Sequence, residues 1–135
     1  QLRFDMPLIA HNCKGPGVYD DEVVSLLPDG SLYFPTYRGC VTVMGLNDNA
    51  LPGAALMLRI CDQAEPFLNA PAFQRFEHTD AGELQLVGSD LCLTVGDRSE
   101  STYSSTHRGR SLFMAVCDTA DPARARWQLI PAGAF

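Results

Sequence analysis

Short apolar segments separated by turn-forming residues run along most of this chain. Alternating, β-branched and aromatic stretches predict strands at residues 32–34, 40–43, 84–87 and 91–95. Gly, Pro, Asp and Ser bound these stretches, as expected of the turns that end strands. The best helical candidate, Pro66–Glu77, is interrupted by Pro71, which would break a helix there. The pattern therefore predicts an all-β fold.

Three parts of the sequence repeat the same features in the same order. Each has a Leu five positions before a Cys, in LIAHNC, LMLRIC and LFMAVC (residues 8–13, 56–61 and 112–117). A large or branched apolar residue follows, six positions before a glycine, at Val24, Phe76 and Trp127. Two of these glycines, Gly30 and Gly82, lie ten positions before Cys40 and Cys92, which open the matching segments CVTV and CLTV. Such registered features predict three copies of one structural unit.

Each unit holds four short strands, so three units give about twelve. This is the count of a β-trefoil, in which half of the strands close a barrel and half cap it. Closure also removes the exposed strand edges of an open sheet. We therefore predict a single β-trefoil domain over residues 1–135, with repeats at roughly 1–38, 39–90 and 91–135.

Five cysteines spread along the chain indicate disulfides formed in an oxidising, extracellular compartment. The repeat pairs the Cys that opens one strand with the Cys that ends the next, which predicts the disulfides Cys40–Cys61 and Cys92–Cys117. Gln1 occupies the position that would pair with Cys13, so Cys13 is the odd thiol. It is either a buried unpaired cysteine or bonded to an upstream segment or a partner chain. The start at Gln1, without Met or a signal segment, fits a processed secreted chain or an excised domain.

Composition and motifs argue against several functional classes. Lys+Arg is 10 against Asp+Glu 16, and Lys14 is the single lysine, so the chain is a poor binder of nucleic-acid phosphates. Its apolar runs are far shorter than the roughly 18 residues of a membrane span. The chain has no C-x-x-C pair or clustered histidines for a metal, and no G-x-S-x-G, Walker or H-E-x-x-H motif. We therefore expect no metal, no cofactor and no enzymatic activity.

Three features together resemble the ricin-type (R-type) lectin family. They are the C-[LV]-x-V strand openings, the apolar-x4-Cys second strands, and an element similar to the Q-x-W motif. That element reads Gln74-Arg75-Phe76 in the second unit, Ala125-Arg126-Trp127 in the third, and Glu22-Val23-Val24 in the first. The likeness covers nearly the whole chain, although no copy has the full Q-x-W signature. It implies a lectin module for galactose-like glycans, free-standing or part of a larger secreted protein or toxin complex.

In this family each sugar pocket combines three residues, and no unit of this chain keeps the set. An Asp two residues after the strand-opening Cys is replaced by Arg3, Thr42 and Thr94. An aromatic residue two positions before the second Cys is replaced by His11, Arg59 and Ala115. An Asn just before the Q-x-W element is replaced by Asp21, Phe73 and Arg124. The family's galactose chemistry therefore does not transfer directly.

The first unit is nevertheless the closest to a sugar site. His11 can stack on the apolar face of a sugar and Asp21 can accept hydrogen bonds from its hydroxyls, while Asp5 can replace the missing carboxylate. The alternative is that His11 is a solvated strand residue and Asp21 belongs to an acidic turn.

The third unit carries a long polar loop at Gly96–Arg110. It contains Asp97, Tyr103, His107 and several hydroxyl side chains, a composition that suits sugar or protein recognition. The alternative is a solvated, hydroxyl-rich loop without a ligand.

Three functions fit these observations. The first is a glycan or glycoprotein-binding module, whose single weak pockets of about millimolar affinity would require multivalency. The second is a β-trefoil subunit that has lost sugar binding and binds a partner protein or an upstream domain. The third is a protease inhibitor, for which the sequence identifies no reactive loop.

Overall fold

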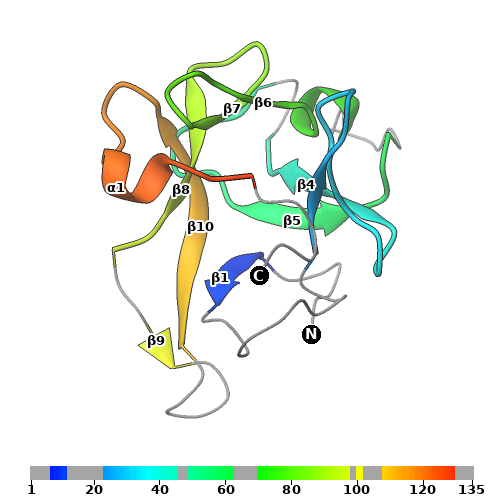
Figure 1. Ribbon diagram of the computed structural model, residues 1–135, viewed down its shortest axis with the longest axis horizontal. Coiled ribbons are helices and arrows are strands. Elements are labelled where there is room, and N and C mark those ends of the chain that lie inside the picture. The colour runs from blue at the N-terminus through cyan, green and yellow to red at the C-terminus, as the bar shows by residue number, and fades with distance from the viewer. Residues whose placement is uncertain are drawn as a thin grey trace.

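Short antiparallel strands dominate the computed structural model, which describes residues 7–11, 23–45, 49–62, 70–97, 100–101 and 108–129 (Figure 1). In chain order the strands are β1 (Ile9–His11), β2 (Ser25–Leu26), β3 (Leu32–Phe34), β4 (Gly39–Val43), β5 (Leu56–Arg59), β6 (Phe76–His78), β7 (Leu84–Leu86), β8 (Leu91–Val95), β9 (Glu100–Ser101) and β10 (Arg108–Val116). One 3-10 turn, η2 (Ala70–Phe73), and one helical turn, α1 (Pro122–Ala125), complete the described elements. The fold of these residues is thus mostly β, as the apolar pattern predicts.

Two four-strand arrangements have the same order and register. β2, β3, β4 and β5 are neighbours in one sheet, and β6, β7, β8 and β10 are neighbours in the other. Tyr33 pairs with Cys40 in the first sheet, and Gln85 pairs with Cys92 in the second. These two pairs are offset by 52 residues, which is the offset of the glycines in the sequence repeat. The residues that repeat in the sequence therefore form the same strand pairs in both sheets.

Backbone hydrogen bonds at the two equivalent glycine turns also repeat. The carbonyl of Gly30 accepts from the N–H of Phe76 at 2.8 Å, and the carbonyl of Gly82 accepts from the N–H of Trp127 at 2.7 Å. Both glycines have positive φ, 95° and 87°, a backbone conformation that other residues rarely adopt. Each hairpin turn is thus bonded to the segment that carries the Q-x-W-like element about 46 residues later.

The structure joins Cys40 to Cys61 and Cys92 to Cys117, the two pairs that the repeat predicts. In each pair the Cα atoms are 5.1 Å apart, an ordinary spacing for a disulfide. Both bonds connect the start of one strand to the end of its neighbour, β4 to β5 and β8 to β10. Cys13 lies outside the described residues.

Among the described residues, the core is one hydrophobic cluster to which both sheets contribute. The strands alternate as half-buried strands should: β5 and β7 bury every second residue, whereas β4 is buried along its length. The buried members are Leu8, Leu32, Val41, Val43, Leu56, Leu58, Phe73, Phe76, Leu84, Leu86, Leu91, Leu93 and Met114. Trp127 packs against this cluster, and its indole N–H donates to the Leu93 carbonyl at 3.0 Å.

Two short helical turns differ from the sequence prediction. Within Pro66–Glu77 the structure has η2, which ends at Phe73 just before β6 begins. The turn α1 was not expected, although its start has ordinary capping chemistry. Asp121 accepts a hydrogen bond from the N–H of Ala123 at 2.9 Å, and a proline occupies the first turn. Four residues are too few to produce a periodic apolar pattern, so only this cap marks the helix in the sequence.

Candidate functional site

In the second and third units, the position that the resemblance assigns to a sugar-binding Asp is buried. Thr42 and Thr94 occupy it, and they are only 0 % and 3 % exposed. Their hydroxyls donate to backbone carbonyls of their own strands, Thr42 to Cys40 at 3.1 Å and Thr94 to Cys92 at 3.0 Å. Because both hydroxyls are buried and paired within the strand, neither is available to a ligand at the surface.

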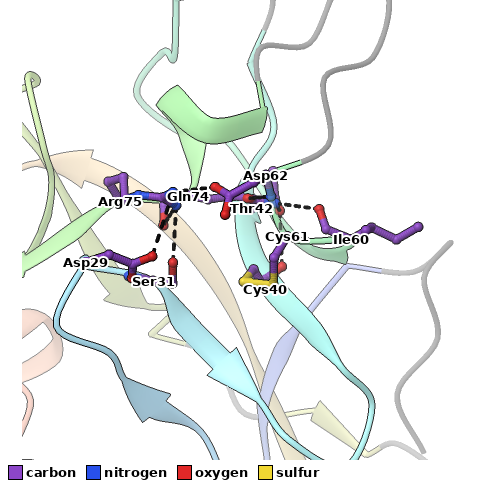
Figure 2. A network of polar contacts seen from close by, with 9 residues as sticks. All are labelled: Asp29, Ser31, Cys40, Thr42, Ile60, Cys61, Asp62, Gln74 and Arg75. Atoms are coloured by element: carbon purple, nitrogen blue, oxygen red, sulfur yellow. Dashed lines mark hydrogen bonds and ion pairs between the residues drawn. A yellow bond between two sulfur atoms is a disulfide. The ribbon is translucent and has the colours of Figure 1, made fainter.

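Gln74, in the second unit's Q-x-W-like element, joins three separate segments (Figure 2). Its amide NH₂ donates to Thr42 Oγ1 at 2.9 Å and to the Ile60 carbonyl at 3.1 Å. Its amide oxygen accepts from the N–H of Asp62 at 2.9 Å. Gln74 is fully buried, so this pairing satisfies polar atoms that would otherwise be costly to desolvate. The side chain therefore fastens the segment after η2 to β4 and to the turn beyond Cys61.

Arg75 extends this network to the surface and to the turn between β2 and β3. Its guanidinium donates to Ser31 Oγ at 3.1 Å, forms a short ion pair with Asp62, and lies 3.8 Å from Asp29 Oδ2 (Figure 2). The backbone N–H of Ser31 donates to Asp29 at 2.9 Å. This hydrogen bond, followed by the Ser31 hydroxyl and the charge of Arg75, lowers the pKa of Asp29 from its usual value of 3.8.

Of the remaining replaced positions in these two units, Phe73 is packed in the interior, Arg124 is ion-paired and Arg59 is half-buried on β5. Phe73 is 2 % exposed, and its ring lies where a Cβ on Gly45 would be, 2.5 Å from the nearest ring carbon. Arg124 pairs with Asp121 at 3.4 Å. Arg59 lies opposite Cys40 on β5, and its Nε is buried without a hydrogen-bond partner among the described residues. The residues that replace the family's set therefore do not form its pocket.

One end of the molecule brings together candidates that the sequence assigned to different units. β10 begins beside β9 and runs from there toward the core, and β1 lies beside the first part of β10 (Figure 1). His11 pairs with Gly109 on β10, and Gly109 in turn pairs with Glu100 on β9. His11, the candidate from the first unit, therefore lies next to β10, the strand in which the polar loop of the third unit ends.

The other predicted site residues are placed as follows. Asp97 is exposed and follows Gly96, whose N–H donates to the Ser111 carbonyl on β10 at 2.8 Å. Ser111 pairs with Ile9 on β1, so Asp97 stands at the same end of the molecule as His11. Four predicted site residues lie outside the described part of the chain: Asp5, Asp21, Tyr103 and His107.

Two further features contain groups of the kind that bind ligands. A shallow hollow on the hairpin of β6 and β7 is lined by Glu77, Gln85, Val87 and Gly88. Glu83 lies close to the bonded pair Cys92 and Cys117, whose sulfurs ligate no metal while they are bonded to each other. None of the helices in the described ranges is both long and apolar enough to cross a membrane.

Sequence reasoning missed the Gln74 and Arg75 network, although the Q-x-W-like element contained both residues. The signal was present in the motif, but the three partners of Gln74 come from β4, the end of β5 and the turn after it. Comparison with known proteins adds no assignment: no family model, no curated protein and no solved structure matches this chain.

Proposed function

We propose that this protein is a secreted carbohydrate-binding module with the β-trefoil fold of R-type lectins, without enzymatic activity of its own. Support for the fold comes from the strand register that the two sheets share over four strands each, and from the repeated glycine-turn hydrogen bonds. Two disulfides at equivalent positions of the repeat favour an oxidising compartment. The proposed trefoil has its three repeats at roughly 1–38, 39–90 and 91–135.

The pairing of β1, β10 and β9 is the observation that carries the glycan-binding proposal. It gathers a histidine, an exposed carboxylate and the ends of a hydroxyl-rich loop at one end of the molecule. Sugar recognition needs such a combination of a ring for stacking and polar groups that bind hydroxyls. The proposed site is therefore a composite of the first and third units, in contrast to the separate pocket per unit that the family resemblance implies.

A multivalent glycan-array screen, with competition by free sugar, tests this proposal. We expect a hit that free galactose-like sugar competes away and that His11→Ala or Tyr103→Ala abolishes. Arg59→Ala is the matched control, because Arg59 lies on β5 in the second unit and should leave binding unchanged. Absence of any competed hit, with the protein folded and both disulfides formed, would rule out the lectin function.

A protein-interaction subunit is the second candidate, and the closed positions in the second and third units favour it. Thr42 and Thr94 are buried, Phe73 packs in the core, and Arg124 is ion-paired, so these units offer little to a sugar. This function predicts that the folded protein retains a specific protein partner in a pull-down after enzymatic removal of the partner's glycans. Loss of the partner on deglycosylation would instead support the lectin function.

A further inference from the structure

A carboxylate stands beside one of the two disulfides. A carboxylate oxygen of Glu83 and the sulfurs of Cys92 and Cys117 all lie within 4.8 Å of one another. Cys92 is fully buried, whereas Glu83 and Cys117 are half-buried, so the group is reached from one side. The backbone N–H of Glu83 bonds to Thr79, but its carboxylate forms no hydrogen bond or ion pair with the described residues.

The equivalent disulfide, Cys40–Cys61, has no such carboxylate at the matching position. Ser31 follows Gly30 as Glu83 follows Gly82 in the repeat. The Ser31 hydroxyl accepts a hydrogen bond from Arg75 at 3.1 Å. The protein therefore contains two similar cysteine pairs that differ in the residue placed beside them, and this difference provides an internal control.

We propose that reduction of the Cys92–Cys117 disulfide creates a binding site for a thiophilic divalent cation of the zinc class, with Glu83 as the third ligand. Two thiolates and one carboxylate are ligands that zinc accepts, and a water molecule would fill the fourth position of a tetrahedral site. A dithiol reductant supplies two electrons and two protons to the disulfide and is itself oxidised to a disulfide. Binding of the cation then releases the two thiol protons. The two thiolates balance the charge of the cation, and the Glu83 carboxylate gives the site one net negative charge.

The backbone holds the three ligands in place independently of the disulfide. Cys92 lies in β8 opposite Ala115 of β10, within five consecutive pairs between these strands. The N–H of Cys117 donates to the Asp90 carbonyl at 2.8 Å. On its other side Cys92 pairs with Gln85 of β7, two residues after Glu83. Because these contacts do not involve sulfur, they keep the ligands close together after reduction.

Zinc titration of reduced variants tests the site. The variant Cys13→Ser/Cys40→Ala/Cys61→Ala keeps only Cys92 and Cys117, and Cys13→Ser/Cys92→Ala/Cys117→Ala keeps only the other pair. Both are reduced with a phosphine, which becomes a phosphine oxide, and are titrated with Zn²⁺ against a chromophoric chelator. Co²⁺ in place of Zn²⁺ reports thiolate ligation through its charge-transfer absorption. Far-UV circular dichroism and Trp127 fluorescence check that each variant is folded.

We expect one equivalent of Zn²⁺ to bind the variant that keeps Cys92 and Cys117. Adding Glu83→Gln to this variant should weaken the binding of Zn²⁺ by about tenfold or more. The variant that keeps Cys40 and Cys61 should also bind Zn²⁺ about tenfold or more weakly than the variant that keeps Cys92 and Cys117. Equal affinity in all three proteins, or no binding by the folded reduced protein, would overturn the proposal.

If reduction unfolds the variant, Zn²⁺ should restore its circular dichroism only while Glu83 is present, because a ligand that binds the folded state stabilises it. Failure to restore it, or restoration regardless of Glu83, would also overturn the proposal.

Discussion

A buried amide is favourable only when its donors and its acceptor are paired, and Gln74 meets this condition. Its three partners belong to segments that are up to 32 residues away in the chain. The same side chain closes the position that the family resemblance assigns to sugar binding, because it holds Thr42 in the interior. Gln74 therefore acts here as a structural residue.

Replacement of Gln74 should be unusually costly for a polar residue. We expect Gln74→Ala to lower the free energy of unfolding by about 2–4 kcal/mol, since it leaves buried groups without partners. Gln85→Ala is the control: Gln85 is half-buried, and its side chain donates a hydrogen bond to the Ser89 carbonyl, so its loss should be about 1 kcal/mol or less. Urea unfolding followed by Trp127 fluorescence measures both, and equal losses would contradict the role assigned to Gln74.

Asp29 should make the stability of this protein depend on pH in acid. Its pKa is lowered in the folded state, chiefly by the Ser31 backbone N–H, so its contribution is present above its unfolded value of 3.8. That contribution is lost as the pH falls through the lowered folded-state pKa. The melting temperatures of the wild type and Asp29→Asn should therefore differ near neutral pH and converge at low pH. A carboxyl that titrates at 3.8 or higher in the folded protein, measured by NMR, would contradict this expectation.

At the scale of elements, the turn at Gly30 links its hairpin to the segment that begins β6, because the Gly30 carbonyl accepts from the N–H of Phe76. A Cβ built on Gly30 would lie 3.0 Å from the carbonyl oxygen of Phe76, which is backbone and cannot easily move. Gly88 also has positive φ, but a Cβ there meets nothing within 4 Å. A side chain at Gly88 would therefore cause backbone strain only, whereas a side chain at Gly30 would also press against the backbone of Phe76.

Alanine substitution at these two glycines should distinguish the two effects. We expect Gly88→Ala to lower the free energy of unfolding by about 1–2 kcal/mol, from backbone strain alone. Gly30→Ala should lower it by about 1–3 kcal/mol more, because the added methyl group also separates Gly30 from Phe76. Denaturant unfolding of the two variants measures the difference. Equal losses would show that the contact with Phe76 adds nothing to the stability of the turn.

Elements with local signals were predictable, whereas contacts between distant segments were predictable only where the sequence repeat indicated them. Strands β3 and β8 have the predicted bounds because apolar residues and turn residues define them locally. The two disulfides followed from comparing copies of the repeat. The partners of Gln74 and the position of His11 beside β10 depend on how the sheets pack, which no local pattern encodes.

For the whole molecule, each disulfide should contribute comparably to stability. The bonded cysteines are 21 and 25 residues apart, and loops of this size restrict the unfolded chain by about 3 kcal/mol each. We therefore expect Cys40→Ala/Cys61→Ala and Cys92→Ala/Cys117→Ala to lose similar free energies of unfolding in guanidinium chloride. A double variant as stable as the wild type would show that its disulfide does not stabilise the fold.

The pairing of β1 with β10 has a consequence for how the protein is made. Ile9 in β1 is aligned with Ser111 in β10, so this contact closes a loop of about a hundred residues. Contacts between such distant residues form slowly, and this one must wait until β10 has left the ribosome. The nascent chain therefore stays incompletely folded until late in synthesis, which is the state in which a polypeptide can be threaded through a translocation channel.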